Sequence, residues 1–171
     1  LNGSPGTGKT YVLARIKESL QELGEKVVCL APTHAAARLL PDGDTVHHFT
    51  AKWALQANFK GTILLDEISM VPLPLLACLA HLTLNGTKII SFGDFDQLQP
   101  IAESNSWRGC PVPANAFQES RLYKILSDST KFILSRCRRS DQEHFNFYTK
   151  IPSQSLSKAL EQSKRKYEDI E

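Results

Sequence analysis

Eight residues near the start of the chain have the composition of a phosphate-binding loop. They read GSPGTGKT and fit the pattern glycine, four residues, glycine, lysine and then threonine. Glycines let the backbone turn left-handed and approach a ligand closely, so that successive N–H groups can surround phosphate oxygens. In such a loop Lys9 reaches the β- and γ-phosphates and the Thr10 hydroxyl binds Mg²⁺. The predicted nucleoside-triphosphate site comprises Gly3, Ser4, Pro5, Gly6, Thr7, Gly8, Lys9 and Thr10.

The alternative for this stretch is a glycine-rich turn without a ligand. A helical pattern begins near Lys9 and argues against that reading, because a helix start adds the positive end of its dipole to an anion site.

Two acidic residues, Asp66 and Glu67, stand at the end of a short apolar run that reads TILLD. An acidic residue that ends a buried strand is costly unless it serves an ion. Asp66 is placed to hold Mg²⁺, directly or through water. Glu67 could polarise an attacking water as a general base. The alternative is an ordinary acidic strand end.

Two further polar segments follow apolar runs, GDFDQLQP at residues 93–100 and RCRR at residues 136–139. Gln97 can donate to a γ-phosphate and accept from water, so it could report whether that phosphate is present. An arginine in the second segment could reach the same phosphate as a planar, permanently charged fork. The alternatives are a polar loop and arginines that contact solvent or a phosphate backbone.

The segments APTHAAA (residues 31–37) and TVHHF (residues 45–49) carry the residue types that contact nucleic acid. Hydroxyls, small side chains and a helix start suit a sugar–phosphate backbone. The rings of His47, His48 and Phe49 suit base stacking. The three histidines of these segments could instead form a metal cluster or a packed surface, and the metal reading is the least favoured on ligand spacing.

The elements that must position these residues alternate between strands and helices. Strands are predicted at residues 27–31, 62–66, 87–92 and 131–135, and a turn at residues 42–44. Helices are predicted at residues 9–23, 33–40, 51–57, 72–84, 115–127, 140–150 and 155–170, with a loop-rich stretch at residues 98–113. This alternation predicts a parallel sheet covered on both faces, with ligands at the carboxyl ends of its strands.

Bulk properties fit one domain of 171 residues, with 42% hydrophobic and 22% charged residues. No apolar run reaches the length of a membrane span, so no membrane partner is predicted. The four cysteines form no C-x-x-C pair, which disfavours zinc and fits a reducing, intracellular setting in the cytoplasm or nucleus. Cys29 and Cys78 are predicted to be core residues. Leu1 is not a start methionine and almost no strand precedes the loop, which suggests a piece of a longer protein.

Taken together, the order of these motifs resembles superfamily 1 DNA helicases, and within them the RecD-like and Pif-like branch that moves 5′ to 3′. The resemblance runs from Leu1 to about Lys150 and rests on GSPGTGKT, APTHAAA, TVHHF, LLDEIS, GDFDQLQP and LSRCRRS. It implies an α/β fold, namely the three-layer RecA-like P-loop NTPase domain with a mostly parallel central sheet. Residues 1–150 would be this motor domain, and residues 151–171 a helical extension or the start of a linker.

The resemblance also implies roles for single residues. Lys9 and Thr10 match motif I, Asp66 and Glu67 match motif II, and Gln97 matches the motif III glutamine that senses the γ-phosphate. Arg139 matches the motif IV arginine, although the family pattern ends in Tyr/Phe-Arg-Gln and this chain has Arg138, Arg139 and Ser140 there. The segments that touch single-stranded DNA in the family correspond here to Pro32, Thr33, His34, Thr45, His47, His48 and Phe49.

The implied function is that of the N-terminal motor domain of an ATP-dependent DNA helicase that uses ATP and Mg²⁺ and binds single-stranded DNA. The segment that holds adenine and the second RecA-like domain are missing from the sequence, so we expect weak nucleotide binding and poor hydrolysis from this chain alone. A nucleotide-dependent switch or binding module without translocation is the main alternative. A small-molecule kinase is a weaker one, because GDFDQLQP has no part in that chemistry.

Overall fold

Four parallel strands form the centre of the fold. Their order across the sheet is β3 (Gly43–Thr45), β2 (Val27–Ala31), β4 (Thr62–Leu65) and β5 (Lys88–Ser91). The computed structural model describes residues 1–53, 59–94, 106–107, 110–111, 120–127, 130–140 and 145–146. The apolar runs predicted the inner strands well because their side chains are buried on both faces: Leu30, Ile63, Leu64 and Leu65 are all fully buried.

Two shorter strands extend this arrangement. Strand β1 (Asn2–Gly3) pairs in parallel with β8 (Ile133–Leu134), and Asn2 also forms a parallel bridge with Gly93, just beyond β5. The phosphate loop therefore leaves the sheet between β5 and β8. Because β5 lies between β1 and β4, the loop and the acidic pair follow strands that are not direct neighbours in the sheet.

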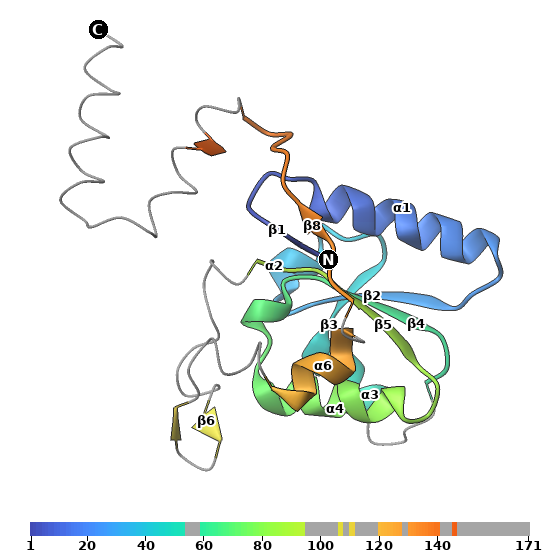
Figure 1. Cartoon of the computed structure of the whole chain (residues 1–171). Coiled ribbons are helices and arrows are strands. Elements are labelled where there is room, and N and C mark those ends of the chain that lie inside the picture. Colours follow the sequence, from blue (N-terminus) through green and yellow to red (C-terminus); the bar gives the residue numbers. More distant parts are fainter. Residues whose placement is uncertain are drawn as a thin grey trace, which may run out of the picture.

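Helices cover both faces of the sheet (Figure 1). Helices α1 (Lys9–Glu22) and α2 (His34–Ala37) pack on one face with a core that includes Leu13, Cys29 and Phe92. On the other face lie α3 (Val46–Trp53), α4 (Leu73–Thr83) and α6 (Arg121–Ser127), with the short 3-10 helix η2 (Ile68–Met70). The predicted α/β fold with a parallel sheet is confirmed.

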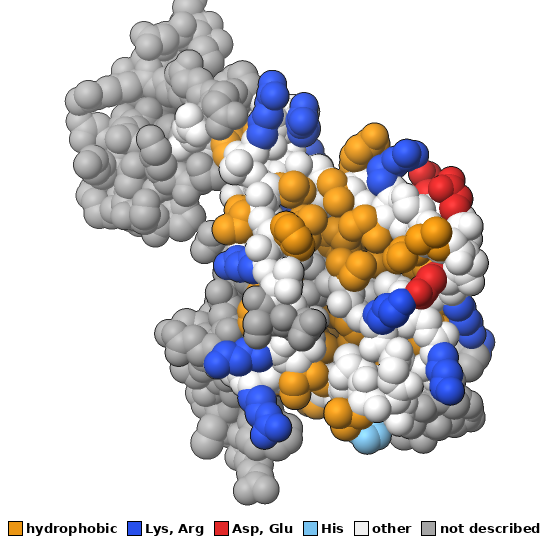
Figure 2. All heavy atoms as spheres, turned by 45° about the vertical axis from the view of Figure 1, so that its right-hand side comes forward, with side chains coloured by type: hydrophobic (Ala, Val, Ile, Leu, Met, Phe, Trp, Pro, Cys, Tyr) orange, Lys and Arg blue, Asp and Glu red, His pale blue; other side chains and the backbone are white. Residues whose placement is uncertain are grey.

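The face with α1 carries apolar side chains that are not fully covered by the described residues. Apolar side chains on and beside α1 are only partly buried there, namely Leu1, Val12, Ile16, Leu20 and Ile90. Figure 2 shows hydrophobic side chains gathered on this side of the molecule.

The prediction was wrong in the stretch between β2 and β4. A turn was expected at residues 42–44, but Gly43–Thr45 is a strand that pairs with Cys29–Ala31. Helix α3 begins at Val46 rather than at residue 51, because the Thr45 hydroxyl accepts a hydrogen bond from the His48 N–H (3.2 Å) and caps the helix. Helix α2 ends at Ala37 rather than at residue 40.

The cysteine prediction holds for one residue of the two. Cys29 is fully buried in β2, as expected. Cys78 is exposed, because α4 turns Leu76, Leu79 and Leu82 to the core and Cys78 to the opposite face.

Several predicted segments reach beyond the described residues. Within the loop-rich stretch, β6 (Ser106–Trp107) and β7 (Cys110–Pro111) form a short antiparallel pair. Only residues 121–127 of the predicted helix 115–127 are described, and only residues 145–146 are described as helical in the predicted helix 140–150. The boundary at residue 150 and the segment 151–171 lie outside the described residues. In the described part, no helix is long and apolar enough to cross a membrane.

Candidate nucleotide-binding site

The phosphate loop turns left-handed at Gly6 and Gly8, with φ of 79° and 92°. A side chain at Gly8 would meet no atom within 4 Å, so this residue faces open space and its backbone conformation is what requires glycine. Inside the loop, the Thr7 hydroxyl donates a hydrogen bond to the carbonyl of Ser4 (2.8 Å). The loop is thus pre-folded into a concave turn that leaves room for an anion.

Lys9 directs its ammonium into this loop. Its Nζ donates to the carbonyl of Gly3 (2.7 Å) and lies 3.5 Å from that of Ser4, while the residue is only 8% exposed. Thr10, the next residue, is exposed at the start of α1. Among the described residues no carboxylate forms an ion pair with this buried ammonium, and phosphate oxygens would supply a direct anionic partner.

The segment that follows β8 packs against the loop. The Arg138 N–H donates to the carbonyl of Gly6 (2.8 Å), and the buried Cys137 places its Sγ 3.8 Å from the same oxygen. A Cβ on Gly6 would lie 3.0 Å from the Cβ of Arg139. A backbone hydrogen bond therefore holds Arg138 beside the loop, and Arg139 follows close to Gly6.

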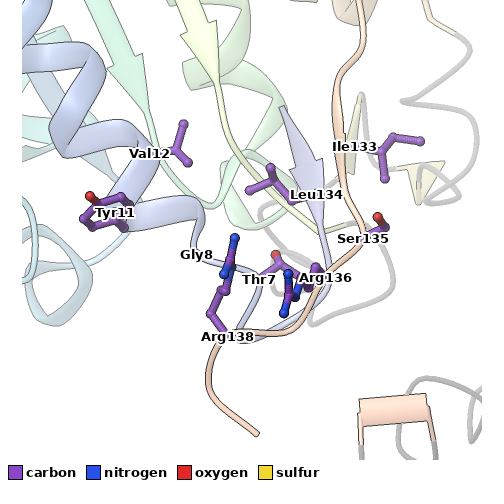
Figure 3. Close-up of a pocket in the computed structure, with 9 residues that line it drawn as sticks. All are labelled: Thr7, Gly8, Tyr11, Val12, Ile133, Leu134, Ser135, Arg136 and Arg138. Atoms are coloured by element: carbon purple, nitrogen blue, oxygen red, sulfur yellow. The ribbon is translucent and has the colours of Figure 1, made fainter. Parts of the chain in front are cut away.

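Two pockets flank the loop. The polar one has a volume of about 510 Å³ and is lined by loop residues including Lys9 and Thr10, together with Glu67, Arg138 and Arg139. The second measures about 810 Å³ and is mostly apolar. Figure 3 shows Tyr11 and Val12 of α1 on one side of it, and residues 133–136 of β8 and its extension on the other. Arg138 lines both pockets, so the polar and the apolar pocket are neighbours beside the loop.

The acidic pair stands at the end of β4. Asp66 is buried, and its Oδ1 accepts a hydrogen bond from the Glu67 N–H (3.0 Å). Glu67 has a left-handed backbone with φ of 49°, which a residue with a Cβ rarely adopts, and it lines the polar pocket. Its Oε2 is buried without a hydrogen-bond partner among the described residues.

Burial raises the pKa of both acids. For Asp66 desolvation is the cause, and the hydrogen bond from the Glu67 N–H and then the charge of Lys9 partly oppose it. Desolvation also raises the pKa of Glu67, and the nearby charges of Asp66 and Asp94 add to it. Both carboxylates thus favour a cation in the site.

We expect the nucleotide-free chain to lose stability as pH rises above about 4, near the ordinary pKa values of 3.8 and 4.5. Both pKa values are higher in the native state, so the native state retains protons that the unfolded state has lost, and the free energy of unfolding falls as pH rises. Glu67→Gln removes one of these groups. It should raise the melting temperature by about 2–4 °C at pH 7 and by less at pH 4, measured by circular dichroism.

The matched control is Glu18→Gln, in an exposed ion pair with Arg15 on the surface of α1. It should change the melting temperature little at either pH. An equal effect of Glu67→Gln at both pH values would contradict the view that ionisation of Glu67 lowers the stability of the chain.

The structure brings several of the predicted residues together. Lys9, Thr10, Glu67 and Arg139 line one pocket, and Asp66 is bonded to the backbone of Glu67. Gln97 lies outside the described residues. Sequence reasoning ranked Arg138 behind Arg139 and missed Tyr11, and an aromatic residue directly after the GKT signature was the available signal for the second pocket.

The residues predicted to contact nucleic acid follow β2 and β3 at the same edge of the sheet. Thr33, His34, His47 and His48 are exposed, and Pro32 is half-buried. The Thr33 hydroxyl caps α2 by accepting from the Ala36 N–H (3.2 Å), and Nδ1 of His48 lies 2.6 Å from Oδ2 of Asp44. Among the described residues, no group of three potential ligands could hold a metal ion.

Two residues of that set are buried instead. Phe49 is 2% exposed and packs edge-on against Phe59 at 5.2 Å, so its ring belongs to the core and cannot stack on a base in this conformation. Thr45 is 4% exposed and caps α3. In this conformation neither side chain is exposed for a contact with DNA, because TVHHF is a strand end and a helix start in which Thr45, Val46 and Phe49 face inward.

The site fits a nucleoside triphosphate with a divalent cation. The ammonium of Lys9 and the open loop match phosphate oxygens, while the apolar pocket beside Tyr11 has room for a base. The Thr10 hydroxyl and the Asp66 carboxylate are oxygen donors of the kind Mg²⁺ takes, and Mg²⁺ is commonly bound by only one or two protein ligands with substrate phosphates.

Comparison with known proteins gives a consistent picture. A family model described as an AAA domain matches residues 1–130. The chain is 30% identical over 113 residues to the ATP-dependent RecD2 DNA helicase of Deinococcus radiodurans, which covers 59% of this chain and 16% of that protein. It is 25% identical over 138 residues to the ATP-dependent DNA helicase Pif1 of Bdellovibrio bacteriovorus, covering 64% of this chain and 31% of the relative.

Solved structures share the fold. The Pif1 helicase from Candida albicans matches with a TM-score of 0.68 at 23% identity, over 87% of this chain and 39% of that one. Pif1 from Bacteroides in complex with ADP-AlF3 and single-stranded DNA matches with a TM-score of 0.68 at 22% identity, over 94% of this chain and 43% of that one. The chain therefore spans less than half the length of these relatives.

Proposed function

Because the chain belongs to the AAA domain family and is distantly related to the RecD2, Pif1 and RecD helicases of superfamily 1, we propose that it is the N-terminal motor domain of an ATP-dependent DNA helicase. The observation that carries this proposal is the polar pocket that gathers Lys9, Thr10, Glu67 and Arg139. The exposed residues after β2 and β3 lie at the carboxyl-end edge of the parallel sheet, as does Glu67 after β4.

In this proposal the loop binds the triphosphate of ATP. Lys9 exchanges the carbonyls of Gly3 and Ser4 for β- and γ-phosphate oxygens, and the loop N–H groups supply further donors. Thr10 and Asp66 hold Mg²⁺, which would neutralise charge on the phosphates when bound. The apolar pocket beside Tyr11 accommodates the base.

Glu67 and the two arginines act on the γ-phosphate. Glu67 would accept a proton from the attacking water. Its raised pKa makes its carboxylate a stronger base, and a bound cation would favour the ionised form. Arg139 would contact the γ-phosphate as a planar fork. Arg138, which lines both the polar and the apolar pocket, would be a second donor to this phosphate. Gln97 is proposed as the sensor on the segment after β5.

The complete motor requires a second RecA-like domain against residues 1–150. Related phosphoryl-transfer sites lose about 10³–10⁵ in rate without a finger arginine. The chain studied alone is therefore expected to bind Mg·ATP weakly and to hydrolyse it slowly, with strand separation a property of the complete protein.

Single-stranded DNA is proposed to bind across Pro32, Thr33, His34, His47 and His48. We expect the chain to bind a fluorescein-labelled oligothymidine, measured by anisotropy. The double variant His47→Ala/His48→Ala should weaken binding by about 5–150-fold, because base stacking contributes about 1–3 kcal/mol per base.

The control is His81→Ala, which removes an exposed imidazole on α4, away from this edge. It should leave the affinity unchanged. A chain that binds ATP but no single-stranded DNA would instead be a nucleotide-dependent switch, and equal losses for both histidine changes would reject the proposed surface.

A further inference from the structure

Lys17 is a lysine inside the fold. It lies in α1, just over two turns and about 12 Å beyond Lys9, and is only 4% exposed. Its ammonium donates to the carbonyl of Pro41 (2.7 Å) and to Oδ2 of Asp42 (2.8 Å). One side chain thus ties the helix that begins with the phosphate-binding lysine to the chain that leads into β3.

Stability alone gives a poor reason for a lysine at this place. Burying an ammonium is costly, and the side chain of its partner Asp42 is 94% exposed, where an ion pair gains little. The α1 residues four and one positions before it and three after it, Leu13, Ile16 and Leu20, belong to or pack against the apolar core of this face. A methionine would fill the same space without a charge to desolvate.

Pro41 and Asp42, which accept the hydrogen bonds of Lys17, lie in a tightly packed turn. Asp42 has a left-handed backbone with φ of 48°. A Cβ on the next residue, Gly43, would lie 2.1 Å from the carbonyl oxygen of Ala37, so the backbones of α2 and β3 touch there. A shift of Pro41 and Asp42 should therefore be passed along the chain rather than absorbed in the turn.

From this turn the chain runs directly to the exposed histidines. Strand β3 follows Asp42, and Thr45 at its end caps α3. Asp44 in the same strand holds the ring of His48 by the 2.6 Å contact. The position of Pro41 and Asp42 thus sets the position of His47 and His48 through a continuous, bonded path.

We propose that Lys17 is a positioning residue that transmits the state of the nucleotide loop to the surface formed by His47 and His48. When Lys9 changes partners from the loop carbonyls to phosphate oxygens, α1 shifts as a rigid body and Lys17 carries Pro41 and Asp42 with it. The inference rests on the proposed function in that it takes the loop to bind ATP and the histidine surface to bind DNA.

Three variants separate transmission from simple stabilisation. Lys17→Met removes the ammonium and keeps an unbranched side chain that is one atom shorter, and Lys17→Arg keeps the charge. Asp42→Asn removes the carboxylate at a position where asparagine tolerates the left-handed backbone. None of these residues lines the polar pocket, so the affinity for the ATP analogue AMP-PNP should stay within about threefold in all of them.

The readout is amide hydrogen exchange of residues 41–48, with and without saturating AMP-PNP and Mg²⁺. The wild type should show a change in exchange in this segment. Lys17→Met should reduce that change at least fivefold, which is the lower end of ordinary coupling between sites, while Lys17→Arg should retain it. The ratio of oligothymidine affinities with and without AMP-PNP should fall towards one in Lys17→Met.

Each result decides the matter. A wild-type response in Lys17→Met, or no response in the wild type with AMP-PNP bound, overturns the inference, as does a lowered melting temperature with an unaltered response. If Lys17→Met is unfolded at the assay temperature, Asp42→Asn should lose at least half of the response, and a full response there overturns the inference. Absence of DNA binding would sink the proposed function but leave the exchange readout intact, whereas absence of AMP-PNP binding would remove both.

Discussion

Lys9→Ala should weaken the binding of ATP by about 10–150-fold. The expectation follows from the loss of a charged donor, which costs about 1.5–3 kcal/mol, and each 1.4 kcal/mol corresponds to a factor of ten. The ammonium is already inside the loop, 2.7 Å from the carbonyl of Gly3. It therefore needs no large rearrangement to reach a phosphate, and no other described lysine lines the polar pocket.

Titration of a fluorescent ATP analogue with Mg²⁺, followed by anisotropy, measures this loss. Lys60→Ala is the control, because Lys60 is exposed and directly precedes β4, at the end of the sheet opposite to the phosphate loop. A melting curve of Lys9→Ala must accompany the titration, since the variant also loses the hydrogen bonds within the loop. A folded Lys9→Ala chain with wild-type affinity would show that the loop is not the triphosphate site.

The parts of the fold that the sequence predicts best are those decided by local composition. Residues 27–31 were predicted as a strand with the bounds that β2 has, because a short, continuously apolar run is typical of a strand buried on both faces. The loop and helix α1 were predicted for a similar reason, since GSPGTGKT and the spacing of Leu13 and Ile16 are both local patterns. The pairing of β1 with β8 was not local and could not be read from two residues.

The candidate site was predictable where its residues follow strands. Lys9, Thr10, Glu67 and Arg139 meet in one pocket because the carboxyl ends of parallel strands share an edge. Tertiary packing decided the misses. Phe49 faces Phe59, which is distant enough in sequence to escape a local pattern, and Lys17 is buried because residue 42 folds back on it. No pattern within α1 distinguishes Lys17 from a surface lysine.

Glu67→Gln is expected to keep nucleotide binding and to lose hydrolysis in the complete motor, with the second domain present. A positioned general base contributes about 10²–10⁴ to a rate, so the hydrolysis rate should fall by that factor. The amide is close in size to the carboxylate and fits the same buried space, but it cannot accept the proton of an attacking water. Because Glu67 lines the pocket that Lys9 and Thr10 line, the base and the phosphate ligands share one cavity.

The measurement pairs steady-state phosphate release, stimulated by single-stranded DNA, with ATP-analogue affinity on the same samples. Asp66→Asn is the comparison, because Asp66 is assigned to the metal: it should weaken binding when Mg²⁺ is present and lose most of the Mg²⁺ dependence. Glu67→Gln should keep that dependence. The negative charge that this variant loses is one that the nearby charges of Asp66 and Asp94 already disfavour. Wild-type hydrolysis in Glu67→Gln would show that another group takes the proton. The buried Oε2 of Glu67, which has no hydrogen-bond partner among the described residues, would then need a different explanation.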